Sequence, residues 1–403
     1  MELTLLGTGA PDGLPRPSCP CAVCASARGP WARAATALLV DDALLLDLTP
    51  GAMFAAARAG RSLAAVRQVL LTHPHDGPAV ELPALLPPAG RVPDGQVLTL
   101  ISGHRVRAVA MDAPGTGYEV TSPEGDRLLY LPPGAAPSGL PERAERAERP
   151  YEMVVLDVIG RPDAVARLRT VGAVGAATEV IAAHLDHDAP PGPALERRLA
   201  AAGARAVPDG TTLVVGEYHA VPDVPLRVLV TGGARSGKSL EAEQRLETFP
   251  EVVYVATGGR RDGDPEWAAR IGLHRERRPG AWRTEETCEL TGLLGADGPP
   301  LLIDCLSLWL TDAMDRVGAW EDERWHDGGE AVLRERVAEL VAAVRATRRP
   351  VVLVTNEVGS GVVPATAAGR RFRDELGRLN AAVAAECEQV LLVVAGQVLV
   401  LRG

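Results

Sequence analysis

The chain has 403 residues, too many for a typical single hydrophobic core, so we expect two domains. Its formal net charge of −10 argues against non-specific binding to nucleic acid. Hydrophobic residues make up 46% of the chain and aromatic residues only 3%, which suits α/β layers with aliphatic cores. The apolar runs are shorter than the roughly 20 residues of a membrane span. Because the sequence also opens on strand-like MELTLLG rather than a basic leader, we expect a cytoplasmic protein.

The first part of the chain contains many short apolar segments that are typical of strands. They cover residues 3–7, 37–48, 66–73, 96–101, 105–111, 126–131 and 152–158. Helical patterns at 52–59 and 194–203 lie between or after them. This mixture predicts layers of sheet and helix.

Three cysteines, Cys19, Cys21 and Cys24, lie within six residues of one another near the start of the chain. Such spacing suits a tetrahedral structural zinc site of thiolates completed by one histidine. The other three cysteines, Cys288, Cys305 and Cys387, are scattered and are interpreted as ordinary buried residues.

The segments MELTLLGTGAPDGLPRPSCPCAVCASARG, DDALLLDLTPG and VLLTHPHDGPA resemble the metallo-β-lactamase fold. They are most similar to phosphodiesterases that act on cyclic phosphates. The resemblance implies an αββα sandwich over residues 1–222 and a fourth zinc ligand late in the domain, for which His219 is our candidate.

The same resemblance implies a two-metal site, but this sequence carries few of the expected ligands. His73 and His75 keep the first half of the motif, and His184 is similar to a terminal ligand. Asp76 then comes one residue early, and Asp112 stands where a histidine is expected. A two-metal catalyst needs about four to six protein ligands. We therefore expect a scaffold that has lost its reaction. A single-metal phosphodiesterase and a ligand-binding domain are the alternatives.

A short proline-containing connector, residues 221–225, separates two patterns. Upstream, residues 211–220 form the last predicted strand of the first domain. Downstream, over 226–403, aliphatic runs alternate with longer helical segments. The predicted strands are 227–232, 252–257, 300–306, 350–356 and 389–396. Near-continuous aliphatic strands are typical of a parallel sheet covered by helices on both faces.

The second domain begins with a phosphate-binding motif. Gly232-Gly233-Ala234-Arg235-Ser236-Gly237-Lys238-Ser239 fits G-x-x-x-x-G-K-[ST] between a strand and a helix, the context that gives the motif its meaning. Backbone N–H groups of such a loop converge on phosphate oxygens. Lys238, the only lysine of the chain, would reach the β- and γ-phosphates, and Ser239 would bind Mg²⁺. Asp304, at the end of a predicted strand, is the expected acidic partner of the magnesium ion.

A histidine among arginines follows. His274 lies close to Arg275, Arg277 and Arg278. A neutral imidazole could attack the α-phosphorus of a nucleotide while the guanidinium groups offset the charge of the departing pyrophosphate. A surface or capping histidine is the alternative.

Six blocks in order decide the interpretation of residues 227–403. They are VLVTGGARSGKS, YVATG, RIGLHRERRPGAWRTEE, LLIDCLSLWLTD, VLVTNEVGSGVVP and GRRFRDELGRLN. Together they closely resemble the bifunctional adenosylcobinamide kinase and adenosylcobinamide-phosphate guanylyltransferase family of cobalamin assembly. The resemblance implies a P-loop fold that uses ATP or GTP first as a kinase. GMP then passes from GTP through His274 to give adenosylcobinamide-GDP.

The resemblance also implies that Lys238, Ser239 and Asp304 are nucleotide and magnesium ligands and that Glu286 contacts the nucleotide. It further implies a homo-oligomer, for which we favour a trimer. Asn356 and Glu357, and the arginines 370, 371 and 373, are candidate substrate contacts; a capped loop and a solvated helix face are their alternatives. A P-loop kinase of another small substrate and a metal-dependent hydrolase remain the competing functions.

Overall fold

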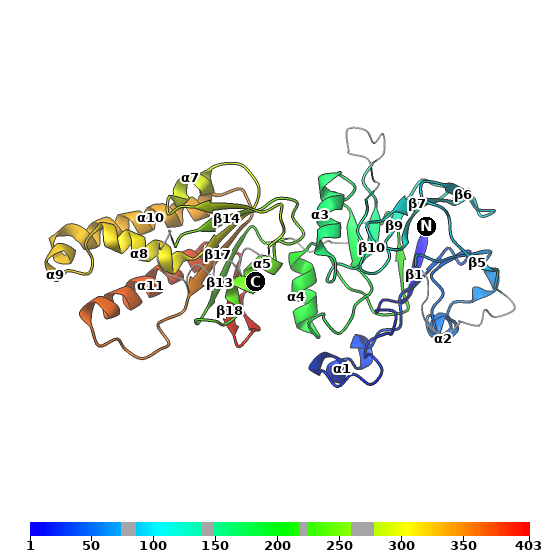
Figure 1. Ribbon diagram of the computed structural model, residues 1–403, viewed down its shortest axis with the longest axis horizontal. Helices are drawn as coiled ribbons and strands as arrows, with labels where there is room; N and C mark the ends of the chain where they lie inside the picture. Colours follow the sequence, from blue (N-terminus) through cyan, green and yellow to red (C-terminus); the bar gives the residue numbers. More distant parts are fainter. Residues whose placement is uncertain (74–85, 139, 141–148, 218–223, 259–277) are drawn as a thin grey trace. The chain divides into compact units, whose positions relative to one another are not determined.

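The computed structural model describes residues 1–73, 86–138, 140, 149–217, 224–258 and 278–403. These residues divide into two compact units, Met1–Val224 and Pro225–Gly403 (Figure 1). Each unit is described by itself below.

Two six-stranded sheets form the centre of the first unit. In spatial order, the first sheet consists of β12 (Thr211–Val214), β1 (Glu2–Gly7), β2 (Ala37–Val40), β3 (Leu44–Leu46), β4 (Gln68–Leu70) and β5 (Ala89–Gly90). The second consists of β11 (Glu179–Ala182), β10 (Met153–Leu156), β9 (Arg127–Tyr130), β8 (Thr116–Thr121), β7 (Arg105–Ala110) and β6 (Val97–Thr99). Strands β3, β4 and β5 run parallel, as do β9, β10 and β11, and the other neighbours are antiparallel.

The alternation of side chains along each strand builds three layers of core. Leu38 and Val40 of β2 join a core shared by both sheets, whereas Leu39 between them faces the outer side. Helix α2 (Ala52–Arg58) covers the outer face of the first sheet. Helices α3 (Pro162–Thr170) and α4 (Pro193–Ala201) cover the outer face of the second. The predicted αββα sandwich is confirmed.

Among its described residues, the first unit also contains three short helical segments. They are α1 (Ala22–Ser26) and the 3₁₀ helices Gly29–Trp31 and Leu63–Ala65. Helix α1 follows Cys21 and carries Cys24, so it holds part of the cysteine cluster.

One seven-stranded sheet forms the second unit. Its spatial order is β15 (Arg283–Glu286), β14 (Val253–Ala256), β16 (Leu301–Asp304), β17 (Val351–Asn356), β13 (Arg227–Gly232), β18 (Gln389–Val394) and β19 (Gln397–Arg402). The first six strands are parallel, as predicted, and β19 returns antiparallel to β18 at the edge.

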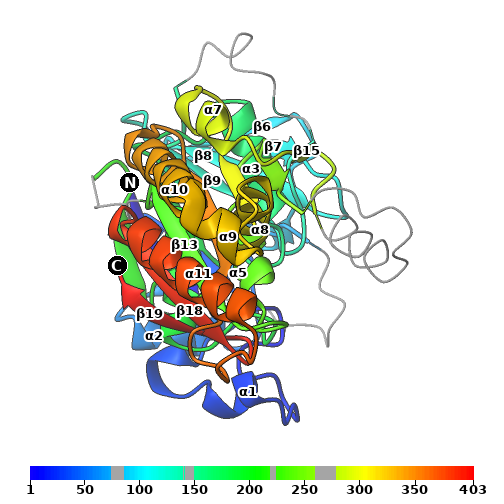
Figure 2. The same cartoon turned by 90° about the vertical axis from the view of Figure 1, so that its left-hand side faces the viewer.

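Helices cover both faces of this sheet, which fits strands that are aliphatic on both sides. Its described helices are α5 (Lys238–Gln244), α7 (Leu290–Gly295), α8 (Leu306–Arg316), α9 (Asp322–Arg324), α10 (Glu330–Ala346) and α11 (Ala367–Ala385), with a π-type turn at Trp325–Gly329. Helices α7, α8, α10 and α11 pack over one face, and Figures 1 and 2 show α8, α10 and α11 grouped together. Helix α5 and Trp282 pack over the other face.

The strand register brings several candidate residues to one edge of the sheet. Gly232, the last residue of β13, pairs with Asn356, the last residue of β17. Asp304, the last residue of β16, pairs with Val354 of β17 and Ala256 of β14. Because ligands of open α/β sheets bind outside the carboxyl ends of the strands, this edge is where a nucleotide site is expected.

Candidate functional site

The turn between β13 and α5 is tightly folded. Gly232 lies so close to its neighbours that an added Cβ would be 2.5 Å from the carbonyl oxygen of Val393 and 2.6 Å from Ser236 Oγ. Gly237 has φ +101°, a conformation that side chains rarely adopt. The glycines therefore allow the chain to reverse within a few residues, as a phosphate-binding loop requires.

Three polar side chains at this turn are buried: Thr231 at the end of β13, Ser236 and Lys238. Lys238 is 7% exposed, and its Nζ donates a hydrogen bond to the carbonyl oxygen of Gly233 at 3.2 Å. Within the described part of the chain, the buried hydroxyl oxygens of Thr231 and Ser236 have no hydrogen-bond partner. Buried polar atoms without partners are uncommon. The ammonium group of Lys238 and the Ser236 hydroxyl in the turn, with the Thr231 hydroxyl at the end of β13, fit a bound polyphosphate.

Asp304 is held in a defined orientation at the neighbouring strand end. The Tyr254 hydroxyl of β14 donates a hydrogen bond to Asp304 Oδ2 at 2.9 Å. Burial, together with the Asp304 carboxylate, raises the pKa of Tyr254 well above its usual range, so the phenol stays a donor. One oxygen of Asp304 is thus fixed by the protein.

The end of β17 is tied to the same edge. The Asn356 side-chain amide donates to Ser307 Oγ at 2.8 Å, and the Glu357 backbone N–H donates to the carbonyl oxygen of Gly232 at 3.1 Å. The Glu357 carboxylate accepts a hydrogen bond from the backbone of Gly359, which is a loop-capping contact. Asn380 of α11 donates to the carbonyl oxygen of Asn356 and so braces the strand end.

The three arginines of α11 have local partners. Arg370 donates to the carbonyl oxygens of Pro364 and Ala365, and Arg373 pairs with its neighbour Asp374. Arg371 donates to the carbonyl oxygen of Ala319 and to Asp322. These contacts fit the structural alternative for the three side chains.

The remaining residues that were predicted to contact the nucleotide are Ser239, Glu286 and His274. Ser239 is partly buried in the first turn of α5, and Glu286 is exposed at the end of β15. His274 lies outside the described residues, as do Arg275 and Arg277. Their predicted roles stay predictions.

The three clustered cysteines all lie close to His187, a histidine that was not predicted as a ligand from the sequence. His187 Nδ1 lies 3.2 Å from Cys19 Sγ and 3.8 Å from both Cys21 Sγ and Cys24 Sγ. All four ligand atoms lie within 4.8 Å of one another. A tetrahedral zinc ion with ordinary bond lengths separates a sulfur and a nitrogen ligand by about 3.6 Å. The four side chains therefore fit a zinc site, and the segment HLDHD was the signal in the sequence. His219 lies outside the described residues.

The pKa values of two cluster thiols differ with their surroundings. The backbone N–H of Cys24 lowers the pKa of Cys21 to about 7, whereas burial raises the pKa of Cys24 to about 11. The other three cysteines all have raised pKa values. Burial raises that of Cys288 to about 11 and that of Cys387 to about 12, and it also raises that of Cys305. Raised values of this kind are typical of unreactive buried thiols.

The described part of the expected two-metal site is occupied by internal contacts. Asp47, which was not among the expected ligands, is buried with its Oδ1 4.0 Å from His73 Nδ1, and it accepts hydrogen bonds from the backbone and hydroxyl of Thr72 and from the Tyr130 hydroxyl. His184 Nε2 lies 3.0 Å from the carbonyl oxygen of Leu131, and its ring stacks on Tyr130. Burial lowers the pKa of His184 to about 4. His73 Nδ1 lies 2.8 Å from Thr72 Oγ1. His75 and Asp76 lie outside the described residues.

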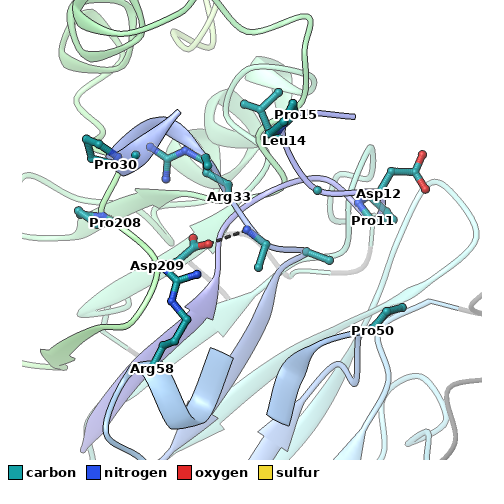
Figure 3. Close-up of a pocket in the computed structure, with 15 residues that line it drawn as sticks. Pro11, Asp12, Leu14, Pro15, Pro30, Arg33, Pro50, Arg58, Pro208 and Asp209 are labelled. Carbon is teal, nitrogen blue, oxygen red and sulfur yellow. Dashed lines mark hydrogen bonds between the residues drawn. The ribbon is translucent and has the colours of Figure 1, made fainter. Parts of the chain in front are cut away.

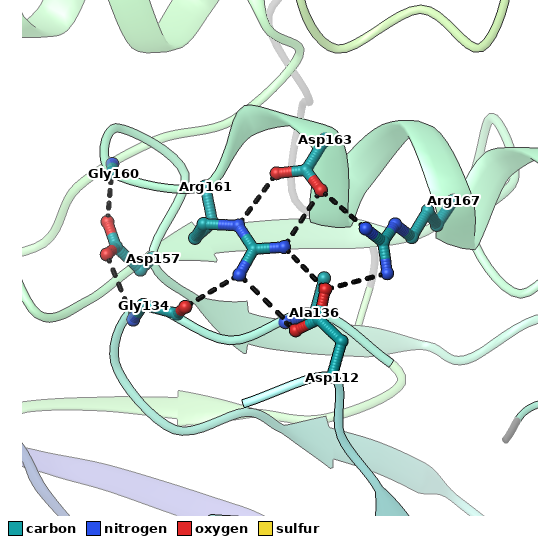
Figure 4. A network of polar contacts seen from close by, with 8 residues as sticks. All are labelled: Asp112, Gly134, Ala136, Asp157, Gly160, Arg161, Asp163 and Arg167. Atoms are coloured by element: carbon teal, nitrogen blue, oxygen red, sulfur yellow. Dashed lines mark hydrogen bonds and ion pairs between the residues drawn. The ribbon is translucent and has the colours of Figure 1, made fainter. Parts of the chain in front are cut away.

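Asp112, which stands where a metal-binding histidine was expected, belongs to an ion-pair network instead (Figure 4). Its carboxylate binds Arg161 at 2.8 Å and Arg167 at 2.9 Å, and it accepts a hydrogen bond from the backbone of Ala136. Asp163 binds both arginines from the first turn of α3. The hydrogen bonds from Arg161 hold the pKa of Asp112 well below its usual range. The carboxylate of Asp112 is thus paired with two arginines, at the start of α3 and within it, and it does not fit the role of a metal ligand.

A cavity of about 760 Å³ lies in the first unit beside the turn that follows β1 (Figure 3). Arg33 and Asp209 line it and join the segments around it. Arg33 donates to Thr8 Oγ1 and to the carbonyl oxygen of Val207, and Asp209 accepts from the backbone of Ala34 at 2.6 Å. These contacts fix the wall of the cavity.

In the second unit, a tight glycine turn, an inward-facing lysine at the start of a helix and an oriented carboxylate at a neighbouring parallel strand end define a P-loop nucleotide-using enzyme. The sequence matches the family described as cobinamide kinase / cobinamide phosphate guanyltransferase over residues 228–401. The chain belongs to this family, and the first unit is an addition outside the matched residues.

Curated relatives agree with this assignment. The bifunctional adenosylcobalamin biosynthesis protein CobU of Salmonella typhimurium is 41% identical over 177 residues, which cover 42% of this chain and 97% of that protein. Protein CobU of Escherichia coli matches to the same extent. The bifunctional protein CobP of Pseudomonas aeruginosa is 42% identical over 183 residues, or 44% of this chain and 98% of that protein.

Two solved structures resemble the chain more weakly. A diphosphatase from the PhnP family is 20% identical with a TM-score of 0.40, covering 55% of this chain and 99% of that structure. Zn²⁺-bound PqqB from Methylobacterium extorquens is 17% identical with a TM-score of 0.38, covering 53% and 100%. No functional conclusion follows from these two likenesses. Among the described helices, none is both long and apolar enough to cross a membrane.

Proposed function

We propose that the second unit phosphorylates adenosylcobinamide on its alcohol with ATP or GTP and then converts the phosphate into adenosylcobinamide-GDP. The arrangement of Lys238, Ser236 and Asp304 at one sheet edge, in a chain of this family, is the observation that carries the proposal. One nucleotide site would serve both steps, because each begins with a bound nucleoside triphosphate.

The described residues divide the work of binding. Lys238 is placed to turn from the Gly233 carbonyl oxygen to phosphate oxygens, and the buried Ser236 hydroxyl is free to donate to one. Ser239 and Asp304 would hold Mg²⁺, which neutralises charge on the β- and γ-phosphates when bound. Tyr254 orients Asp304 for that task.

In the second step, an imidazole nitrogen of His274 attacks the α-phosphorus of GTP. A phosphorus–nitrogen bond forms, the bond between the α-phosphorus and the bridging oxygen breaks, and pyrophosphate leaves with that electron pair. A phosphate oxygen of the corrinoid phosphate then attacks the same phosphorus. This step releases the imidazole and forms the diphosphate of adenosylcobinamide-GDP.

Turnover of the two steps, followed separately, tests this function. Lys238→Ala should lose both activities, because it removes the ammonium group that both triphosphates need. His274→Ala should keep the kinase step, with adenosylcobinamide phosphate accumulating, and should lose formation of the GDP adduct. A His274→Ala variant that makes the adduct at the normal rate would contradict the covalent route.

We also propose that Cys19, Cys21, Cys24 and His187 bind one structural zinc ion. The distances of 3.2 to 3.8 Å between His187 Nδ1 and the three sulfur atoms, with all four ligand atoms within 4.8 Å of one another, support this site. Purified protein should contain one zinc ion per chain, and Cys19→Ser should lower that content, whereas Cys387→Ser should not. Equal zinc content in both variants would overturn the site.

For the first unit we propose a scaffold without two-metal hydrolase activity. Two observations support this: Asp112 pairs with Arg161 and Arg167, and His184 Nε2 lies within hydrogen-bond distance of the Leu131 carbonyl oxygen. The full-length protein with added Mn²⁺ or Zn²⁺ should not cleave a phosphodiester such as bis-p-nitrophenyl phosphate above the background rate. Metal-dependent cleavage that Asp304→Ala leaves intact and His73→Ala removes would refute the proposal.

A homo-oligomer, a trimer by the family resemblance, and a cytoplasmic location remain predictions. Light scattering on purified protein measures the first, and cell fractionation measures the second.

A further inference from the structure

The cavity of the first unit shown in Figure 3 is separate from the metal sites considered above. The described residues that line it include none of Asp47, His73 and His184, and none of the clustered cysteines. Its volume of about 760 Å³ lies within the range of about 300–1,000 Å³ that is usual for small-molecule sites. The cavity is therefore large enough for a ligand of its own.

A buried guanidinium group lines this cavity and has donors left over. Arg33 is only 6% exposed, and its Nη1 donates to Thr8 Oγ1 at 2.6 Å and to the Val207 carbonyl oxygen at 2.9 Å. Among the described residues, the hydrogen bonds of this side chain use Nη1 alone, and Nε is buried without a partner. Buried donors without partners are uncommon. The side of a guanidinium group formed by Nε and Nη2 matches two oxygens of a carboxylate or phosphate.

The Thr8 hydroxyl links Arg33 to a carboxylate that also lines the cavity. It accepts the hydrogen bond from Arg33 and donates to Asp209 Oδ1 at 2.8 Å. Asp209 Oδ2 accepts from the backbone of Ala34 at 2.6 Å. Because a carboxylate offers about four acceptor sites, Asp209 can accept further hydrogen bonds from a ligand. A positive and a negative group are thus held close together in the wall of one cavity.

The charges around the cavity favour a ligand that carries both signs. Two arginines, Arg33 and Arg58, are among its described lining residues, and two aspartates, Asp12 and Asp209, balance their formal charge. Burial lowers the pKa of Arg33 and raises the pKa of Asp209, because each charged group has lost part of its hydration. Ligand groups of opposite charge would restore some of that lost stabilisation at both places.

We propose that this cavity binds a small zwitterion, a molecule with an ammonium group a few atoms away from a carboxylate or phosphate group. Arg33 receives the anionic group, and Asp209 accepts hydrogen bonds from the ammonium group. A ligand with only one charged group would meet a like charge on Asp209 or on Arg33 and be repelled by it. The site belongs to the first unit, so it does not depend on the proposed activity of the second.

Binding of simple zwitterions to the full-length protein tests the site. The probes are β-alanine and phosphoethanolamine, which differ in their anionic group. Propionate, ethyl phosphate and ethylamine carry one charged group each and are the control ligands. Every protein in the comparison carries Lys238→Ala, which suppresses binding of phosphate groups at the P-loop. Saturation-transfer NMR titrations measure the dissociation constants.

Three further substitutions change the cavity, and a fourth is the matched control. Arg33→Lys keeps the charge and loses the planar guanidinium group, whereas Asp209→Asn removes the negative charge. Ala34→Phe adds a large side chain at an exposed lining position and leaves the polar groups in place. Arg105→Met changes an exposed arginine of β7, which belongs to the other sheet.

We expect at least one of the two zwitterions to bind at one site per chain, at least about tenfold more tightly than the control ligands. This is the effect of about one charge-assisted hydrogen bond. Arg33→Lys and Asp209→Asn should each weaken binding at least about fivefold. Ala34→Phe should abolish binding, and Arg105→Met should leave it unchanged. The tighter of the two zwitterions identifies the anionic group that Arg33 prefers.

Three results would overturn the proposal. They are no binding of either zwitterion, equally tight binding of a control ligand, and binding that Ala34→Phe leaves intact. If Arg33→Lys or Asp209→Asn unfolds, the comparison of Ala34→Phe with Arg105→Met decides.

Discussion

The side chain of Lys238 offers an unusually clean chemical test, because it is the only lysine in the chain. It is 7% exposed and directed at the Gly233 carbonyl oxygen. An amine-reactive reagent should modify Lys238 slowly in the free protein. Saturating Mg²⁺–GTP should slow that modification at least tenfold, because phosphate oxygens would then bind the ammonium group and protect it from the reagent. Peptide mass mapping measures the modified fraction, with the N-terminal amine as internal reference. Equal labelling with and without nucleotide would contradict the assigned role of Lys238.

Asp112 gives a prediction about pH. Its pKa is depressed in the folded protein by Arg161 and Arg167, so its contribution to stability is present above the unfolded pKa of about 3.9 and is lost as the pH falls through the folded value. Asp112→Asn should lower the free energy of unfolding by about 1.5–3 kcal/mol at pH 7, the range for hydrogen bonds to charged groups.

Urea unfolding from pH 7 to pH 3 measures this effect. The difference in unfolding free energy between the wild type and Asp112→Asn should shrink as the pH falls below about 4. Glu124→Gln, a change at an exposed carboxylate, should leave the unfolding free energy unaltered at every pH. A gap for Asp112→Asn that does not depend on pH would show that charge is not the cause.

At the scale of single residues, the candidate site residues that could be predicted from the sequence are those that belong to a continuous local motif. The P-loop positions and Asp304 could be named because strand, turn and helix follow one another directly. His187 and the partners of Asp112 could not, because contacts between residues more than 40 positions apart depend on the fold. Arg278 was interpreted from its charge alone, since no local pattern reveals Tyr254 beneath it.

At the scale of elements, the turn from β13 into α5 predicts a contrast between adjacent glycines. Gly232→Ala would place a Cβ 2.5 Å from the Val393 carbonyl oxygen, whereas Gly233→Ala meets no atom within 4 Å. Gly232→Ala should therefore lower the free energy of unfolding by about 1–3 kcal/mol, the usual effect of overpacking. Gly233→Ala should change it by less than about 0.5 kcal/mol. Urea unfolding without nucleotide measures both variants, and similar values for the two would show that the turn is not as tightly packed as described.

The strands show which elements a sequence can predict. Aliphatic runs such as those of β13, β16 and β17 were predicted because every residue is buried in the centre of a sheet. Strand β8 (TGYEVT) lies between β9 and β7 in the second sheet of the first unit. It was not predicted because its polar residues are not typical of a buried strand. Strand β15 (RTEE) has no apolar residue at all and depends on backbone pairing with β14.

At the scale of the whole molecule, the chain joins two units that each have their own cores. A ligand that binds one unit should therefore stabilise that unit by mass action. Scanning calorimetry should show two transitions: Mg²⁺–GTP should raise one, and a zinc chelator should lower the other. Nucleotide at about 100 times its Kd should add about 2.7 kcal/mol to the unit it binds. Lys238→Ala should remove the first shift and keep the second. A single transition moved by both agents would contradict this independence.

The most direct test of the account is the mass of the intact protein after incubation with Mg²⁺–GTP, without any corrinoid acceptor. We predict an added mass of one GMP group per chain, located on the peptide that contains His274, and its disappearance when adenosylcobinamide phosphate is supplied. Protein that gains no GMP while it still produces adenosylcobinamide-GDP would contradict a covalent histidine intermediate.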